Sequence, residues 1–159
     1  MIKVLFVCLG NICRSPLAEG IFKDKVRKAG LDDKFTIESG GTSGWHIDEQ
    51  PDPRSREVAE RHGIYLDSLG RKAVNEDFKE FDYIVAMDSD NYADLKHLPA
   101  SSDPDAAQLF LMRDFDDLGK GLDVPDPYYG GKDGFDHVYE LLDRSCEQFL
   151  DFVIKENNL

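Results

Sequence analysis

Residues 1–16 constrain the fold of this chain more than any other stretch. Residues 2–7, IKVLFV, form an almost continuously apolar run in which Lys3 is the only charge. A run of this kind, bounded by a turn, is typical of a buried strand in a parallel sheet. Ser15-Pro16 then indicates a helix start, with Ser15 as the N-cap and Pro16 as the first helical residue. The stretch therefore predicts a strand, a tight loop and a helix in immediate succession.

The predicted loop begins with Cys8 and ends with Arg14. The first backbone N–H groups of a helix lack partners, and the helix dipole favours negative charge there. A compact loop leading into the helix adds inward N–H groups and makes an anion nest, and Arg14 adds a planar fork suited to phosphate oxygens. The same positive field favours the thiolate of Cys8, so the loop predicts a phosphate site above a nucleophile. The alternative is a buried core cysteine at a strand end, which fits a lone Cys better than it fits this spacing.

The segment CLGNICRSP, residues 8–16, resembles the signature loop of the low-molecular-weight protein tyrosine phosphatases, in their bacterial form. The sequence DPYY at residues 126–129 and the length of 159 residues fit the same family. The resemblance covers essentially the whole chain. It predicts a single phosphatase domain over residues 1–159.

Composition limits the compartment and the partners. The chain is 41% hydrophobic and 32% charged, which is typical of a globular domain. Its net charge of −13 argues against nucleic acid and anionic membranes as main partners. No apolar run is long enough for a transmembrane helix, and residues 2–7 are too short for an export signal. Three cysteines are too few for a disulfide scaffold, so we expect a cytoplasmic protein.

Strand and helix signals alternate along the chain. Further strands are expected at residues 35–39, 83–87 and 108–112. Helices are expected at residues 16–29, from 53 to about 62, after caps at Asn75 and Asp88, and at about 134–155. This alternation implies a parallel sheet covered on both faces. The predicted fold is α/β: a flavodoxin-like, doubly wound, four-stranded parallel sheet with its site at the carboxyl end of the first strand.

The resemblance and the chemistry together indicate three catalytic residues. Cys8 is expected to attack phosphorus while Arg14 and the loop N–H groups stabilise the equatorial oxygens. Asp126, between two prolines, is expected to protonate the tyrosyl oxygen and later to activate water. Asp88 is the competitor for the acid role, but we interpret it as a helix cap. Ser15 is expected to hydrogen-bond the thiolate, and no metal or cofactor is required.

Further roles follow from the resemblance. The substrate or its phosphate is expected to contact Leu9, Gly10, Asn11, Ile12, Cys13, Ser15, Trp45, Tyr128 and Tyr129. Asn11 and Ser39 resemble residues that stiffen the loop through side-chain hydrogen bonds. Near Ser68 the sequence lacks a histidine that many members carry, so this support is expected to be altered. Cys13 is expected to capture an oxidised Cys8 as a disulfide, whereas Cys146 is interpreted as a core residue.

Several other functions stay open as alternatives. An arsenate reductase of this fold needs further cysteines near the site, and an arginine phosphatase is implied to carry a threonine where this chain has Ile12. A phosphocarrier or a non-catalytic phosphotyrosine-binding module is disfavoured by Cys8, Arg14 and Asp126 occurring together. The expected partners are phosphotyrosine-containing proteins, such as a bacterial tyrosine kinase or a host protein. The chain itself is expected to be a monomer or a weak dimer.

Overall fold

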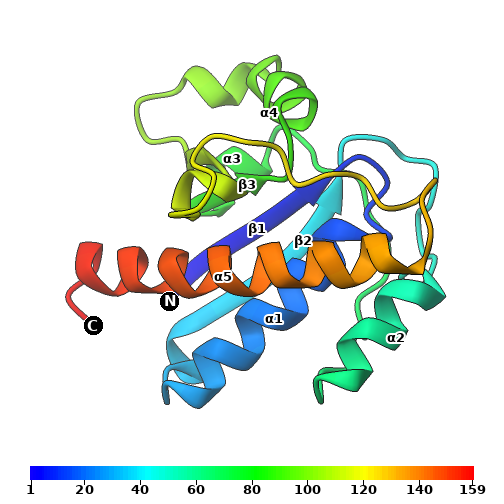
Figure 1. Ribbon diagram of the computed structural model, residues 1–159. Helices are drawn as coiled ribbons and strands as arrows, with labels where there is room; N and C mark the ends of the chain where they lie inside the picture. Colours follow the sequence, from blue (N-terminus) through cyan, green and yellow to red (C-terminus); the bar gives the residue numbers. More distant parts are fainter.

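The computed structural model describes the backbone of residues 1–159 and every side chain except that of Lys132. Its centre is a four-stranded, all-parallel sheet in the order β2-β1-β3-β4 (Figure 1). The strands are β1 (Ile2–Cys8), β2 (Phe35–Gly41), β3 (Tyr83–Ala86) and β4 (Gln108–Leu111). Because the chain moves from β1 to one side for β2 and to the other for β3, the strand order reverses beside β1. Ligands bind at this place in open α/β sheets, beyond the carboxyl ends of the strands.

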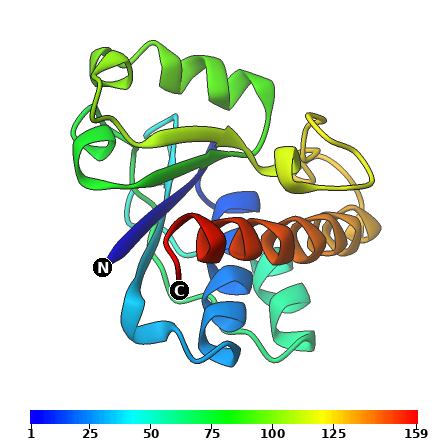
Figure 2. The same cartoon turned by 90° about the vertical axis from the view of Figure 1, so that its left-hand side faces the viewer.

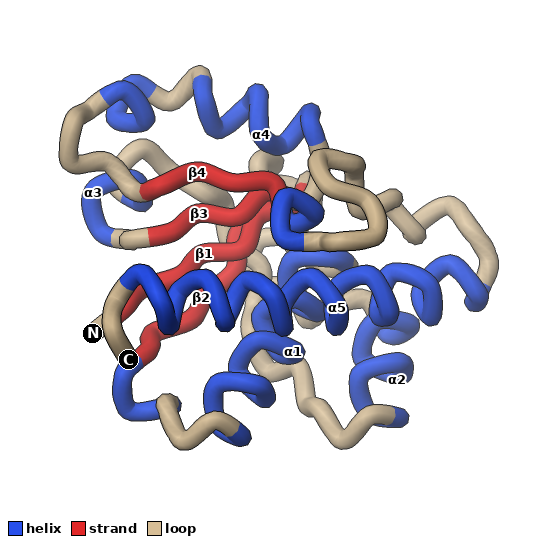
Figure 3. The backbone as a smooth tube through the Cα atoms, turned by 60° about the vertical axis from the view of Figure 1, so that its left-hand side comes forward, coloured by secondary structure: helices blue, strands red, loops and turns tan.

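Helices cover both faces of the sheet, as the sequence predicts. They are α1 (Arg14–Lys28), α2 (Pro53–Arg61), α3 (Asp77–Glu80), α4 (Ser89–Lys96) and α5 (Lys132–Glu156). In Figures 2 and 3, α1, α2 and α5 lie on one side of the sheet, and α3 and α4 lie on the other. None of the helices in the described part of the chain is long and apolar enough to cross a membrane.

The side chains of β1 alternate between two cores. Val4 and Phe6 belong to the core under α1 and α5, whereas Leu5 and Val7 belong to the core under α3 and α4. Phe6 is fully buried, and its ring meets that of Phe22 edge-on at 5.5 Å. Burial of one such ring stabilises the fold by about 1.5–3 kcal/mol. The apolar run therefore holds β1 rigidly at the centre and fixes the position of Cys8 at its end.

Two predicted helix caps are wrong. Helix α1 begins at Arg14 with Cys13 at the N-cap position, so Ser15 and Pro16 lie within its first turn. Pro16 is tolerated there because the N–H groups of the first turn have no intrahelical acceptor. The earlier start turns the hydroxyl of Ser15 toward Cys8 instead of toward the helix backbone. Asn75 does not cap α3 with its side chain, because its Oδ1 accepts the backbone N–H of Ala100 at 2.7 Å.

Candidate active site

The loop of residues 9–13 joins β1 to α1 at the carboxyl edge of the sheet. Asn11 in this loop has a φ of 57°, in the left-handed region. Among the described residues, the backbone N–H groups of residues 10–13 donate to no protein acceptor. Successive unpaired N–H groups around a left-handed residue, at the start of a helix, form a concave site for an anion.

Cys8 lies beneath this loop and is 2% exposed. Its Sγ is 3.0 Å from the Oγ of Ser15, which lies in the first turn of α1. A hydroxyl at this distance can donate its proton to a thiolate. The geometry therefore places one neutral donor directly beside the sulfur.

Asn11 fixes the loop to three other parts of the molecule. Its Nδ2 donates to Ser15 Oγ at 2.8 Å and to the Oγ of Ser39 on β2 at 3.0 Å. Its Oδ1 accepts the backbone N–H of Arg71 at 3.0 Å. The chain segment that carries Ser68 thus contributes a backbone donor at Arg71 to the support of the loop.

Arg14 is held in one orientation although its side chain is only 2% exposed. Its Nη1 donates to Asp88 Oδ2 at 2.6 Å and to the backbone oxygen of Val124 at 3.0 Å. Burial would lower the pKa of Arg14, but Cys8 and Asp88 outweigh it and raise the pKa above its ordinary value. The Nε of Arg14 is buried and has no hydrogen-bond partner among the described residues. The guanidinium is therefore charged, fixed and still able to donate.

The two candidate acids differ in what their oxygens contact. Asp88 uses Oδ1 to cap α4 at the backbone N–H of Asn91 and Oδ2 to pair with Arg14. Within the described residues, Asp126 accepts only the backbone N–H of Tyr128, at 3.0 Å, and it lies 3.6 Å from Arg14 Nη2. Its side chain is 36% exposed, against 18% for Asp88. Asp126 is thus the carboxyl that stays accessible for proton transfer.

A cavity of about 140 Å³ lies above Cys8. It is lined by Cys8, Leu9, Gly10, Ile12, Cys13, Arg14, Trp45, His46, Asp126, Tyr128 and Tyr129. Of the predicted contact residues, Asn11 and Ser15 do not line it; their side chains hydrogen-bond to each other and hold the loop in place. Trp45 is 71% and Tyr129 is 92% exposed, so these two rings form the rim of the cavity and not its depth.

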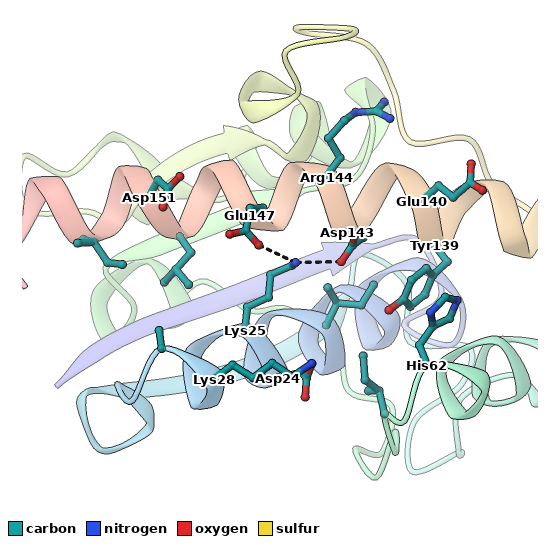
Figure 4. A pocket seen from close by; sticks show the side chains of 15 residues that line it. Asp24, Lys25, Lys28, His62, Tyr139, Glu140, Asp143, Arg144, Glu147 and Asp151 are labelled. Atoms are coloured by element: carbon teal, nitrogen blue, oxygen red, sulfur yellow. Dashed lines mark hydrogen bonds and ion pairs between the residues drawn. The ribbon is translucent and has the colours of Figure 1, made fainter.

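A larger hollow of about 860 Å³ lies elsewhere, between α1 and α5 (Figure 4). Its central cation, Lys25, is already paired with Asp143 at 2.9 Å and Glu147 at 2.8 Å. At one end of it His62 stacks on Tyr139, with the ring centroids 3.8 Å apart. Because none of its lining residues belongs to the loop at residues 9–13, we take the smaller cavity as the candidate site.

Cys13 is a second buried thiol, 5% exposed and at the N-cap position of α1. Burial, with a further contribution from the nearby carboxylate of Asp52, raises the pKa of Cys13 well above its ordinary value. Its backbone oxygen accepts the hydroxyl of Ser55 at 3.1 Å. Cys13 is therefore held as a neutral thiol at the edge of the cavity.

Sequence reasoning missed three contributions to this site. It assigned Asp88 to a cap without its second contact with Arg14, because no local pattern reveals a pair 74 positions apart. It did not count His46 among the substrate-contacting residues, although the imidazole lines the cavity beside Trp45. It also passed over Glu19, a buried carboxylate that accepts the hydroxyl of Ser39 at 2.6 Å. The only available signal for Glu19 was its position among the apolar residues of α1.

Comparison with known proteins identifies the family. Residues 3–159 match the family model described as low molecular weight phosphotyrosine protein phosphatase. The low molecular weight protein-tyrosine-phosphatase YfkJ of Bacillus subtilis is 42% identical over 160 residues, covering 100% of both chains.

Solved structures agree with this assignment. The protein tyrosine phosphatase of Entamoeba histolytica, crystallised with Hepes in its active site, superposes with a TM-score of 0.90 at 42% identity, covering 100% of both chains. The Drosophila arginine phosphatase DARP is similar at a TM-score of 0.87 and 37% identity, covering 96% of this chain and 98% of that one. The chain therefore belongs to the low molecular weight phosphotyrosine protein phosphatases, a family of hydrolases.

Proposed function

We propose that this chain hydrolyses phosphotyrosine in proteins through a phosphocysteine intermediate on Cys8. The proposal is carried by the setting of this thiol, beneath a loop whose N–H groups, like the Nε of Arg14, have no protein acceptor in the part of the chain that the structure describes. The carboxyl of Asp126 lines the same cavity. A phosphate group brings the oxygen acceptors that these donors lack, and it places phosphorus above the sulfur.

The reaction then has two steps. The Cys8 thiolate attacks phosphorus, so that an S–P bond forms while the bond to the tyrosyl oxygen breaks. Arg14 and the loop N–H groups stabilise the equatorial oxygens, and Asp126 gives its proton to the leaving oxygen. In the second step Asp126 accepts a proton from the water that attacks phosphorus, and the S–P bond breaks. Ser15 donates to the departing thiolate.

The cavity walls favour phosphotyrosine over the other phosphoamino acids. Leu9 and Ile12 line the cavity, and aromatic rings at Trp45 and Tyr128 continue the wall toward the surface. A flat aromatic ring fits between such walls, whereas phosphoserine is too short to bring its phosphate down to Cys8. Phosphoarginine is the second candidate, because a related structure is an arginine phosphatase. The apolar Ile12, in place of the threonine implied for arginine phosphatases, favours phosphotyrosine.

The test measures phosphate release from a phosphotyrosine peptide, with phosphoserine and phosphoarginine as competitors and with EDTA and a reductant present. We expect Cys8→Ser to abolish turnover and Asp126→Asn to slow it about 10²–10⁴-fold, the usual contribution of a general acid. Preferential release from phosphoarginine would assign the chain to the second candidate. Tight binding of the phosphotyrosine peptide without turnover would instead indicate a binding module.

The other two cysteines have separate places in this proposal. We infer that Cys13 captures a peroxide-oxidised Cys8: the sulfenic acid and the thiol condense to a disulfide and release water. Because Cys13 is a buried, neutral thiol, this condensation is expected to be slow. A peroxide-treated sample should give a Cys8–Cys13 linked peptide that is absent after reduction. Cys146 is fully buried in the core, which disfavours the cysteine relay of an arsenate reductase.

A further inference from the structure

Glu19 is a buried carboxylate on α1 that the proposed reaction does not use. Its side chain is 6% exposed, and an ionised carboxylate is costly to bury unless it is paired. One oxygen, Oε2, pairs with the Nζ of Lys23 at 2.6 Å, and this lysine is 45% exposed. The other, Oε1, accepts the hydroxyl of Ser39 at 2.6 Å. Glu19 therefore joins the surface of the molecule to a buried hydroxyl of β2.

From this hydroxyl, hydrogen bonds continue without a break to the nucleophile. Asn11 Nδ2 donates to Ser39 Oγ at 3.0 Å and to Ser15 Oγ at 2.8 Å. Ser15 Oγ in turn lies 3.0 Å from Cys8 Sγ. Each of these contacts is buried. The series thus runs from Glu19 to the sulfur entirely inside the protein.

The direction of every bond in this series is fixed by its two ends. A carboxylate only accepts hydrogen bonds, so the hydroxyl of Ser39 donates its single proton to Glu19 and accepts a hydrogen bond from Asn11. The backbone N–H of Arg71 only donates, so Asn11 turns its Oδ1 toward Arg71 and both Nδ2 protons toward the hydroxyls. Ser15 therefore accepts from Asn11 and keeps its own proton. This proton has two acceptors in reach, the sulfur of Cys8 at 3.0 Å and the backbone oxygen of Gly40 at 3.3 Å.

We infer that Glu19 is a positioning residue that keeps the proton of Ser15 directed at the thiolate of Cys8. Without an acceptor at position 19, the proton of Ser39 turns toward Asn11 and two donors face each other. The amide then moves, and the hydroxyl of Ser15 is no longer held beside the sulfur. The inference deepens the proposed function, since a thiolate that is better solvated by Ser15 forms more readily and leaves phosphorus more readily.

Charge alone predicts the opposite result. Removal of a buried negative charge favours any nearby thiolate, so a purely electrostatic Glu19 would hinder Cys8. The sign of the effect therefore separates the two accounts.

The variants to compare are Glu19→Leu, Glu19→Gln and Asp24→Asn. Asp24 pairs with Lys28 on the same helix, with the same four-residue spacing as Glu19 and Lys23, and makes no contact with the series that ends at Cys8. It is thus a matched control for the loss of a helix ion pair. Ser39→Ala removes the next link and keeps the test decisive if Glu19→Leu does not fold.

The first readout is the rate at which iodoacetamide alkylates Cys8 at about pH 6, followed on the Cys8 peptide by mass spectrometry. Iodoacetamide is uncharged, so the anion nest does not bias the rate, and the readout needs no turnover. We expect Glu19→Leu and Ser39→Ala to slow alkylation about tenfold, the effect of one hydrogen bond to a charged group. Glu19→Gln, whose amide oxygen can still accept from Ser39, should be alkylated at a rate within about threefold of the wild-type rate. Asp24→Asn should be alkylated at the wild-type rate.

The second readout is turnover of p-nitrophenyl phosphate, with inorganic phosphate as a competitive inhibitor. We expect kcat of Glu19→Leu to fall about tenfold, while KM and phosphate inhibition change less than about twofold. Faster alkylation in Glu19→Leu, an equal effect in Asp24→Asn, or a raised KM with unchanged alkylation would each overturn the inference. If neither the wild type nor any variant turned over substrate, the proposed function would fail. The role of Glu19 would still stand if the alkylation rates of the variants differed as expected.

Discussion

At the scale of single residues, the site depends on how firmly Arg14 is held before any substrate arrives. Asp88 and the backbone oxygen of Val124 both bind its Nη1, while Nε has no partner in the described part of the chain and Nη2 lies 3.6 Å from Asp126. A guanidinium fixed in this way needs little reorganisation when phosphate binds. The ion pair with Asp88 is therefore best understood as orienting Arg14.

The variant Asp88→Asn tests this role and leaves the fold intact. Asn is as good an N-cap as Asp, so residue 88 can still accept the backbone N–H of Asn91 and cap α4. Arg14, however, loses its charged partner. We expect kcat/KM for a phosphotyrosine peptide to fall about 10- to 100-fold, the usual cost of a lost charge-assisted hydrogen bond, with thermal stability nearly unchanged. Asp88→Ala removes both contacts and serves as the comparison. If Asp88→Asn kept wild-type activity, the pairing would have no orienting role.

At the scale of elements, α2 anchors the segment that carries Asp126. Arg54 in its first turn binds Asp52 and donates from Nη2 to the backbone oxygen of Tyr128 at 3.1 Å. Its guanidinium also lies over the ring of Tyr128 at 5.5 Å and over that of Phe135 at 4.6 Å. One side chain thus joins the start of α2, the segment after Asp126 and the start of α5.

Loss of this anchor should impair the acid step selectively. In Arg54→Gln, kcat/KM for phosphotyrosine should fall about tenfold, because its leaving group is poor and needs a proton. The kcat/KM for p-nitrophenyl phosphate should fall about twofold or less, because its leaving group needs little protonation. The measurement is the ratio of the two losses. Arg61→Gln is the control, because Arg61 lies at the other end of α2 and pairs with Asp136. Equal losses for both substrates would show that Arg54 does not act through Asp126.

The positions of the strands and helices could be predicted from local sequence pattern, whereas the contacts between them could not. The apolar run of β1 and the turn after it act through neighbours in the chain, so the strand, the loop and the helix could be inferred from local pattern. The predicted cap of α1 is wrong because the hydroxyl of Ser15 contacts Cys8 and Asn11 instead of the helix backbone. These tertiary contacts override the local preference of serine for the N-cap position. The pairing of Asp88 with Arg14 and the burial of Glu19 also depend on how the sheet brings distant segments together.

At the scale of the whole molecule, one buried acid fastens the long segment between β4 and α5. Asp116 has a fully buried side chain that accepts Arg144 Nε at 2.7 Å, Arg113 Nε at 2.9 Å and the backbone N–H of Leu118 at 3.0 Å. Arg144 belongs to α5, so the carboxylate clamps this segment against the helix. The same segment carries Val124, whose oxygen holds Arg14. The clamp thus supports the site from a distance.

The clamp should make stability depend on pH. The hydrogen bond from Arg144, opposed by burial and supported by Leu118 and Arg113, lowers the pKa of Asp116 from 3.8 to about 2. A folded-state pKa below the unfolded one stabilises the fold at pH values above the unfolded pKa, and this contribution is lost as the pH falls through the folded pKa. The shift corresponds to about 2 kcal/mol of unfolding free energy at neutral pH.

We therefore expect Asp116→Asn to lower the free energy of unfolding by about 2–3 kcal/mol at pH 7, since it leaves two arginines without their shared carboxylate. Because protonation removes the same charge from the wild type, the difference between the two proteins should shrink as the pH falls from about 4 to about 2. Urea unfolding across this range measures it. Asp136→Asn breaks an exposed pair with Arg61 and should cost less than about 1 kcal/mol at any pH. A difference between wild type and Asp116→Asn that stayed constant with pH would mean that Asp116 stabilises the fold by packing and not by its charge.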